Sequence, residues 1–387
     1  YYCNKILENK GNLKKTWEVI NLLRGKNKKS VKPQFIVDGS RIVERRIIAN
    51  KFNEYFNSIA SKMNQSLTGE LNIEAIPSFL EFMPKRNLKS MFMADCTTEE
   101  ISKIIASLQN GKASDFPIKM IKQLSPVLSP ILTCQFNHLM ALGIFPSVLK
   151  IGKISPIFKK DNEELMSNYR PVSTLPIFGK IFEKVIYSRL YGFLVSQGAL
   201  HDSQFGFREG HSTSHELNYH KILLDKLEIY GVRGKIHDLI SSYLSDRNQY
   251  VSVLGEISDS LPKVYGVPQG SCLGPLLFLI YINDLANTDR NIKLVLFADD
   301  TNIFVSGQSR EEIYRKANAF LKCISRYTLA NKLHINAKKS CFIEFGQADS
   351  PNSDQTLSKT LQINGVPLLK VDETKFLGVT IDGKLNF

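Results

Sequence analysis

The chain has 387 residues, of which 43% are hydrophobic and 22% are charged, close to the composition of ordinary globular proteins. This composition excludes wholesale disorder, collagen and a small disulfide scaffold, and the length suggests about two or three domains. With 50 Lys and Arg against 37 Asp and Glu, the formal net charge is +13.

The positive charge is concentrated at the N-terminal end. Residues 1–51 hold 13 Lys and Arg but only four Asp and Glu, a net charge of +9, which leaves +4 for the other 336 residues. Clustered cations are typical of proteins that bind a polyanion, nucleic acid first, because neutralised phosphates release their counterions. A solvated tail that aids solubility explains the charge equally well.

Cysteine usage and hydropathy indicate the compartment. The six cysteines include no C-x-x-C pair, which favours free thiols in a reducing environment. No signal peptide is apparent. The most apolar stretch, 273–285, is too short to span a bilayer and predicts a buried helix. We therefore expect an intracellular protein with no membrane partner. Because the chain starts at Tyr1 without Met, we expect it to be a fragment.

Hydrophobic periodicity predicts helices first and a mixed α/β pattern from about residue 145. Expected helices cover 12–24, 45–63, 177–196, 236–244 and 311–333, and a further one begins after Thr97. Expected strands cover 153–158, 250–254 and part of 335–345. Residues 64–94 are predicted to be a polar connector, and 292–305 to be a β-hairpin around an acidic pair.

That pair, Asp299 and Asp300, could hold a divalent metal, because Mg²⁺ accepts one or two protein carboxylates together with substrate phosphates. Asp is also common in ordinary turns, and taken alone the pair favours a polar hairpin turn.

A loop rich in Gly and Pro at 266–275 precedes the expected buried helix. Glycine lets a backbone approach a ligand closely, a helix N-terminus favours anions, and Gln269 could reach a base or sugar. A loop that merely caps a core helix explains the pattern equally well.

Five cations lie on and after the strand expected at 153–158 and could bind a triphosphate, with Arg forming bidentate contacts. They are Lys150, Lys153, Lys159, Lys160 and Arg170. A solvated basic hairpin accounts for them without any ligand, and without context it is favoured.

The trio His211, His215 and His220 contains the spacing of a zinc pair on a helix. No further ligand set accompanies it, so a polar surface stretch is favoured.

Together and in order, these segments closely resemble the reverse transcriptases of non-LTR (LINE-type) retrotransposons, from about residue 95 to the end. The matching segments are Pro156-Ile-Phe-Lys-Lys160, Asn168-Tyr-Arg-Pro-Val172, Gln204-Phe-Gly-Phe-Arg208, Val267-Pro-Gln-Gly-Ser-Cys-Leu-Gly-Pro275, Phe297-Ala-Asp-Asp300, Asn331-Lys-Leu-His-Ile-Asn-Ala-Lys-Lys339 and Lys375-Phe-Leu-Gly-Val-Thr-Ile-Asp382.

The resemblance implies an α+β fold, a right-hand polymerase with palm and fingers and an N-terminal helical extension. The segments expected are a basic helical linker or arm at 1–94, a helical N-terminal extension of the polymerase at 95–145, the fingers and palm at 146–345, and a primer-grip-like segment at 346–387, truncated before the thumb.

The resemblance also assigns the nucleotide-binding residues. Lys153 and Arg170 would lie over the incoming triphosphate, and Gln269 and Gly270 would lie by the nucleotide and the template. The partners it implies are an RNA template, a DNA primer and dNTPs, and the location it implies is the nucleus.

The catalytic residues implied are Asp299, Asp300 and Lys339. Asp299 would be a metal ligand in a two-Mg²⁺ site with Asp300 beside it, and Lys339 would lie near the leaving pyrophosphate as a possible proton donor. The primer end would be held by Phe376, Leu377 and Gly378.

One part of the family pattern is missing. The family carries another catalytic aspartate on a strand between the Gly-Phe-Arg segment and the helix that begins near Lys221. Here the short stretch between them has no apolar run ending in Asp, and Asp225 belongs to the helix. That aspartate would bridge both metals, so we expect its loss to leave the metal site incomplete, to impair catalysis and to leave a gap or rearrangement in the palm sheet.

Two functions therefore stay open. The chain is either an RNA-directed DNA polymerase domain that extends a primer with dNTPs, impaired as written, or a catalytically dead nucleic-acid-binding remnant of such an element. An RNA-dependent RNA polymerase shares the palm chemistry, but the Phe-Ala-Asp-Asp and Val-Pro-Gln-Gly segments argue against it.

Overall fold

The computed structural model describes residues 34–68, 77–204, 220–263, 266–268, 270–289, 292–297, 300–345, 360–376 and 379–384, apart from the side chains of 60–68 and 338. The helix expected at 12–24 and the candidate residues His211, His215, Gln269, Asp299, Leu377 and Gly378 lie outside these ranges.

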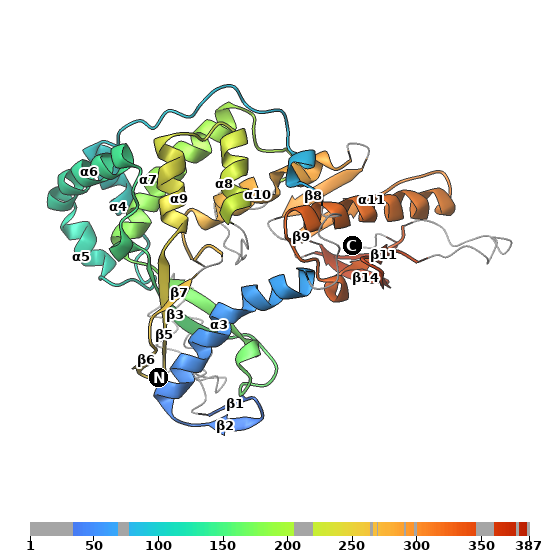
Figure 1. Ribbon diagram of the computed structural model, residues 1–387, viewed down its shortest axis with the longest axis horizontal. Helices are drawn as coiled ribbons and strands as arrows, with labels where there is room; N and C mark the ends of the chain where they lie inside the picture. Colours follow the sequence, from blue (N-terminus) through green and yellow to red (C-terminus); the bar gives the residue numbers. More distant parts are fainter. Residues whose placement is uncertain are drawn as a thin grey trace, which may run out of the picture.

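A five-stranded mixed sheet forms the lower part of the molecule in Figure 1. Its strand order is β4-β3-β5-β6, and β7 also pairs with β5. Strand β3 is antiparallel to β4 and parallel to β5. The bounds are β3 Ile151–Phe158, β4 Tyr169–Thr174, β5 Arg247–Val253, β6 Glu256–Ile257 and β7 Leu261–Lys263.

The first described residues belong to the core of this sheet. Hairpin β1–β2 (Phe35–Val37, Ser40–Ile42) and helix α3 (Arg45–Thr68) pack against it. The rings of Phe35, Phe52 and Tyr169 meet edge to face at 4.9–5.6 Å, the arrangement that aromatic quadrupoles favour. The segment boundaries at 94 and 145 stay a prediction, but the described residues before 60 pack as one body with β3–β5.

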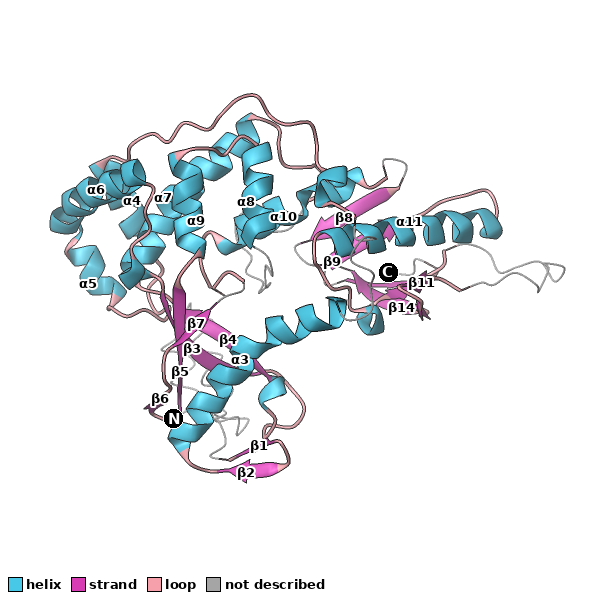
Figure 2. Ribbon diagram, in the orientation of Figure 1, coloured by secondary structure: helices cyan, strands magenta, loops and turns pink. Residues whose placement is uncertain are grey.

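Seven helices of the described chain form a layer above the sheet (Figures 1 and 2). One hydrophobic core joins them. Their bounds are α4 Thr98–Ser107, α5 Ile118–Gln123, α6 Ser125–Leu142, α7 Ile177–Ser196, α8 His220–Ile229, α9 Lys235–Leu244 and α10 Gly274–Ile282.

The predicted helix start at Thr97 is confirmed, because its hydroxyl accepts a hydrogen bond from the Glu100 N–H at 3.2 Å. Helix α7 has the predicted bounds, whereas α6 lies in the segment 95–145 that was expected to be helical but for which its own bounds were not predicted. Pro130 lies inside α6, and an internal proline, which removes one helical hydrogen bond, is a sequence signal against a helix.

The remaining elements lie to the right in Figure 1. Strands β8 (Lys293–Phe297) and β9 (Asp300–Phe304) form the predicted hairpin, and helix α11 (Arg310–Ala330) covers it through Phe320, Ile324 and Tyr327. Short pairs follow, with bounds β10 Cys341–Phe342, β11 Gln362–Ile363, β12 Val366–Pro367, β13 Leu369–Lys370, β14 Glu373–Phe376 and β15 Val379–Asp382.

A buried ion pair fastens α11 to the helical layer. Lys226 of α8 donates to both carboxylate oxygens of Asp284 at 2.6 and 2.8 Å, and both side chains are fully buried. Tyr327 of α11 donates its hydroxyl to the same carboxylate at 2.9 Å. Burial lowers the pKa of Lys226 and raises that of Asp284, whereas their mutual attraction acts in the opposite direction.

Replacing only one partner of this ion pair is expected to lower the free energy of unfolding more than replacing both partners with apolar residues. Lys226→Met leaves a buried, uncompensated carboxylate and should lower the free energy of unfolding by about 3–5 kcal/mol. Lys226→Met combined with Asp284→Leu should recover part of that loss. Urea unfolding of both variants measures the difference, and a double variant as unstable as Lys226→Met alone, or more so, would contradict this view of the pair.

Candidate nucleotide and metal site

The β3–β4 hairpin presents cations on one exposed face. Side chains alternate along a strand, so Lys153 and Ile157 are exposed while Ile154 faces the core. Arg170 pairs with Ile157 across the hairpin and is exposed on the same face. The structure therefore places Lys153 and Arg170 on one surface, although their role stays a prediction.

A third and a fourth cation join this surface. The positive charge of Arg170, followed by that of Lys339, lowers the pKa of Lys159. Lys159 extends the hairpin, since its N–H donates to the Asn168 carbonyl at 2.8 Å. Lys339 ends a short 3-10 turn (Ala337–Lys339) that follows α11. The charge of Lys339, from a separate part of the fold, thus acts on Lys159 of the hairpin.

Lys159 was grouped with the other cations at the sequence level but was not chosen as a site residue. A signal was available in the strand alternation, because Lys159 lies two residues after the exposed Ile157 and is expected on the same face as Lys153. No sequence signal could have shown that Lys339, 180 residues further on, would lie near it.

The loop before α10 approaches this hairpin through glycine. Gly270 has φ +102, and a Cβ there would lie 3.0 Å from the Ser173 carbonyl oxygen of β4. Ser173 is next to Thr174, the cross-strand partner of Lys153. A side chain at position 270 would therefore be strained and crowded. Because glycine has none, the loop can lie directly on β4, the strand that also carries Arg170.

The acidic candidate Asp300 begins β9, opposite Phe297, and is exposed. An exposed carboxylate at a hairpin turn fits the oxygen ligands that Mg²⁺ prefers. Within the described ranges, which omit Asp299, no group of three or more acids, His or Cys is placed to share one metal ion.

The primer-grip candidate Phe376 lies against the same hairpin. Its ring meets that of Phe304, the last residue of β9, edge to face at 6.1 Å. The structure therefore brings the site residues together in two groups. Lys153, Arg170 and Gly270 lie at the β3–β4 hairpin, where the charge of Lys339 also acts, and Asp300 and Phe376 lie at opposite ends of β9. Gln269, Asp299, Leu377 and Gly378, being undescribed, are placed in neither.

Glu344 ties the C-terminal strands to α11. Its carboxylate accepts hydrogen bonds from Arg310 and Tyr314 at the start of α11 and from Lys370 of β13. Burial acts to raise the pKa of Glu344, but these three bonds outweigh it and lower the pKa to about 2.

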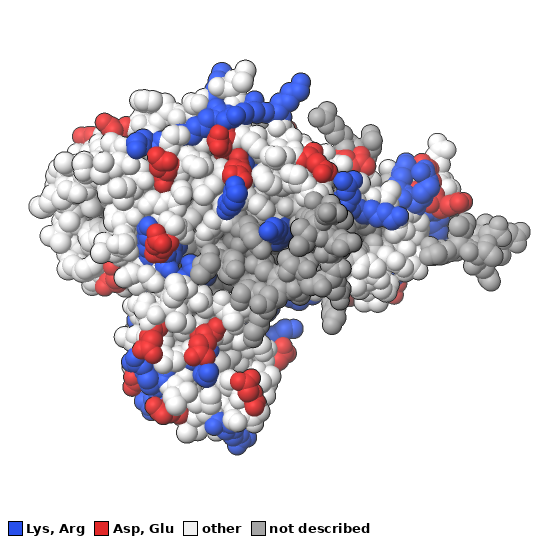
Figure 3. Space-filling view, in the orientation of Figure 1, with Lys and Arg blue, Asp and Glu red and all other residues white. Residues whose placement is uncertain are grey.

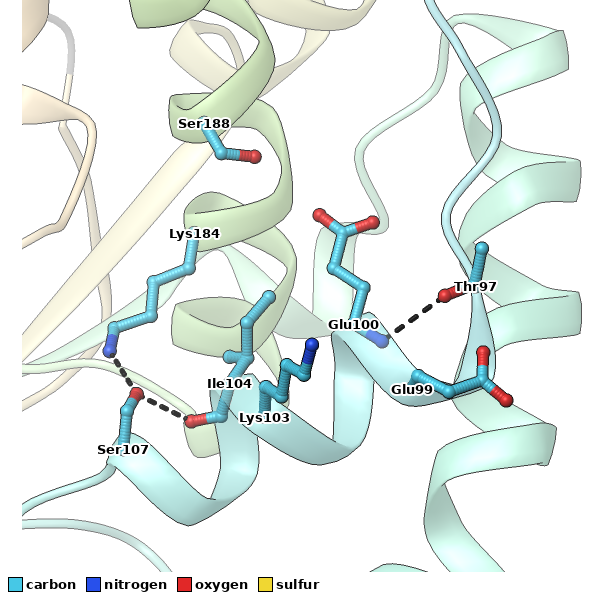
Figure 4. A pocket seen from close by; sticks show the side chains of 8 residues that line it. All are labelled: Thr97, Glu99, Glu100, Lys103, Ile104, Ser107, Lys184 and Ser188. Carbon is cyan, nitrogen blue, oxygen red and sulfur yellow. Dashed lines mark hydrogen bonds between the residues drawn. The ribbon is translucent and has the colours of Figure 1, made fainter.

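Other surfaces are less distinctive. The pocket in Figure 4, between α4 and α7, is lined by Glu99 and Glu100 as well as Lys103 and Lys184. Lys184 is engaged there with Ser107 at 2.9 Å. In the view of Figure 3, Lys and Arg are interspersed with Asp and Glu, and the part over α4–α6 shows mainly uncharged side chains. Neither feature offers the like-charged, converging groups of the β3–β4 hairpin.

Two of the sequence expectations concern the thiols and the membrane. The described cysteines, Cys96, Cys134, Cys272, Cys323 and Cys341, are free thiols. Of the helices that the structure describes, none combines the length and the apolar character needed to cross a membrane.

His220, which was expected to lie in a polar surface stretch, is half-buried, and its Nε2 lies 3.0 Å from the Gly266 carbonyl oxygen.

Residues 157–381, more than half of the chain, match the family model described as reverse transcriptase (RNA-dependent DNA polymerase). The chain therefore belongs to the reverse transcriptase family, a family of nucleotidyltransferases.

Its curated relatives are proteins of mobile elements. The chain is 29% identical over 328 residues to the probable RNA-directed DNA polymerase from transposon X-element of Drosophila melanogaster, covering 74% of this chain and 35% of the relative. It is 27% identical over 349 residues to the RNA-directed DNA polymerase from mobile element jockey of the same species, covering 79% and 37%. The chain thus spans about a third of the length of these relatives.

The Glu344 network predicts acid sensitivity of the C-terminal strands. Because its folded pKa is about 2, below the usual value of 4.5, its contribution is full above about pH 4.5 and is lost as the pH falls towards 2. Glu344→Gln should lower the free energy of unfolding at pH 7 by about 1.5–3 kcal/mol and flatten the dependence below pH 4.5. The exposed pair of Glu81 with Arg326 provides the control. Glu81→Gln should cost less than about 1 kcal/mol, and equal losses in urea titrations of the two variants would contradict the account.

Proposed function

We propose that this chain is the reverse transcriptase domain of a non-LTR retrotransposon, an RNA-directed DNA polymerase that extends a primer with dNTPs and is impaired as written. The observation that carries the proposal is that Lys153 and Arg170 lie on one exposed face of the β3–β4 hairpin. The positive charges of Arg170 and Lys339, which lower the pKa of Lys159, support it. A triphosphate is a ligand that such clustered cations suit, and family membership makes it a nucleotide.

The residues then have distinct tasks. Arg170 forms charge-assisted contacts with phosphate oxygens, for which its planar guanidinium is suited. Lys153 and Lys159 add positive charge on the same face, and Lys339 donates a proton to the leaving pyrophosphate. Gly270, by lying on β4 without a side chain, and Gln269 beside it border the space for base and sugar. Phe376, Leu377 and Gly378 hold the primer end near β9.

Asp299 and Asp300 would hold Mg²⁺, and their carboxylate chemistry fits that ion. Bound there, the metal would supply activation of the primer 3′-hydroxyl and stabilisation of the leaving oxygen. Asp300 is held at the start of β9 by its pairing with Phe297 of β8, where it would bind the metal. Phe376 contacts Phe304 at the other end of β9 and would help to hold the primer.

Impairment follows from the missing strand. Among the described strands, β9 pairs with β8 alone, and Phe304 at its end is 43% exposed. On the other side of β8, Leu296 donates its N–H to the Ser203 carbonyl at 2.8 Å, just before the stretch where the family's aspartate is expected. With one bridging carboxylate fewer, two metal ions would not be held in line.

The second candidate, a nucleic-acid-binding remnant, is favoured by the same missing aspartate. Cation groups and aromatic side chains suffice to bind a template and primer, whereas catalysis needs the complete set of carboxylates. The two candidates differ in whether synthesis returns when the strand is restored.

Primer extension on an RNA template with Mg²⁺ and dNTPs tests the proposal. The chain as written should show at most traces of product, and a version with an apolar strand ending in Asp restored between Thr213 and His220 should synthesise DNA. In that version, Arg170→Ala should lower kcat/KM for dNTPs at least about tenfold, as expected for a lost charge-assisted contact of about 1.5–3 kcal/mol. Lys119→Ala on α5, an exposed cation away from the hairpin, should have no effect.

Robust synthesis by the unrestored chain would refute the impairment. Binding of RNA and DNA without synthesis by the restored chain would favour the remnant, and incorporation of ribonucleotides in preference to dNTPs would favour an RNA polymerase.

The basic N-terminal segment should provide salt-sensitive, sequence-independent binding. Residues 1–33 hold nine Lys and Arg against two Glu, and a deletion of these residues ends before hairpin β1–β2, which begins at Phe35. The deletion should weaken RNA binding at low salt and reduce the slope of log affinity against log salt. Fluorescence anisotropy at several salt concentrations measures both, and an unchanged slope would assign the charge to solubility alone.

A further inference from the structure

Glu183 is a carboxylate buried in the middle of α7, 1% exposed, and the activity proposed above gives it no role. It accepts the backbone N–H of Cys272 at 2.5 Å and that of Leu273 at 3.4 Å, and the Tyr243 hydroxyl donates to it at 3.3 Å. Its chief partners are therefore backbone groups of the loop 266–273, about 90 residues further along the chain.

A buried guanidinium balances this carboxylate. Arg247, at the start of β5, is 2% exposed, lies over the ring of Tyr243 at 4.9 Å and donates to the Tyr243 carbonyl at 2.9 Å. Burial raises the pKa of Glu183, and the positive charge of Arg247 opposes that rise. Burying a charge is costly, and here the oxygens of Glu183 are engaged as hydrogen-bond acceptors by Cys272, Leu273 and Tyr243.

The requirement concerns the loop rather than the helix that follows it. Helix α10 receives no capping bond from its own N-cap residue, Leu273. The loop closes locally instead, because the Ser271 hydroxyl accepts the Gly274 N–H at 3.0 Å. At the other end of the loop, the Gly266 carbonyl lies 3.0 Å from Nε2 of His220. The loop is thus attached at both ends, and Gly270 between these attachments lies on the Ser173 carbonyl of β4.

We propose that Glu183 is a positioning residue for the incoming nucleotide: by accepting the N–H groups of Cys272 and Leu273, it fixes the described part of the loop 266–273 so that Gly270 lies against β4. Helix α7 begins shortly after β4 ends. Glu183 therefore holds the loop in a defined position relative to the β3–β4 hairpin, which carries Arg170. The inference rests on the proposed function for its nucleotide, but the anchoring of the loop stands on the geometry alone.

The thiol of Cys272 reports on the anchor. Burial and the negative charge of Glu183 raise the pKa of Cys272 to about 12, so alkylation at neutral pH is expected to be slow. Glu183→Ala should release the loop and raise the alkylation rate of Cys272 at least about tenfold, because the thiolate is the reactive form. Peptide mass spectrometry separates Cys272 from the exposed Cys134 and Cys341, which serve as internal references.

Glu183→Gln is the matched variant. It removes the charge but keeps an oxygen that accepts the two N–H groups, so its Cys272 should stay close to the wild-type rate. If Gln and Ala raise the rate equally, loss of the charge alone explains the change and the anchor is refuted. Leu132→Ala in α6 is the stability control, since it removes buried packing far along the sequence from the loop. An equal rise in Cys272 reactivity there would show general loosening and would also overturn the anchor.

Nucleotide binding provides the second readout. With primer–template and Mg²⁺, Glu183→Ala should weaken dNTP binding at least about fivefold while primer–template affinity stays unchanged, and Glu183→Gln should restore most of it. An unchanged dNTP affinity in Glu183→Ala, with a released loop, would refute the role in nucleotide placement. Absence of dNTP binding by the wild-type chain would refute the proposed function, whereas the Cys272 rates would still decide the anchor.

Discussion

Helix α10 is the constraint on which the arrangement of the site depends. Its nine residues carry no charged side chain, and every one except Pro275 is buried. A helix that is apolar all round has to lie inside the core. Both of its ends are fixed by buried charge, at the start by Glu183 and just past the end by Asp284 with Lys226 and Tyr327. At 1.5 Å per residue, the helix sets a spacing on the order of 13 Å between the loop that contacts β4 and the segment that leads into the β8–β9 hairpin.

This constraint explains why residues distant in the sequence can act together. The loop at the start of α10 touches the hairpin that carries Lys159 and Arg170, and α11, fastened through Tyr327, is followed by the turn that brings Lys339 to the same hairpin. Like charges held together raise the free energy of the folded chain unless an anion is bound. The cations of this hairpin carry such a cost, which is the physical reason to expect a phosphate ligand there.

The sequence predicted elements well where a single period dominated. The alternation of β3, the helix at 177–196 and the acidic hairpin are local patterns and were visible directly. The bounds of helix α6 were not predicted, because Pro130 inside it is a sequence signal against a helix. The hairpin β1–β2 was not predicted, because strands of three residues carry almost no periodic signal. The candidate site residues come from the family motifs, and their roles stay predictions. Glu183 could not be found, since an acidic residue in an amphipathic helix normally predicts an exposed position, and only the fold shows the loop it serves.

If the β3–β4 hairpin and the loop 266–273 enclose the nucleotide together, photocrosslinking will detect it without requiring catalysis. A thio-substituted deoxyuridine triphosphate, irradiated with the chain, Mg²⁺ and a primer–template, should attach to peptides covering 153–174 and 266–273. Unlabelled dNTP should compete with it. Attachment confined to other surfaces, such as the pocket between α4 and α7, or attachment that dNTP does not displace, would contradict the account.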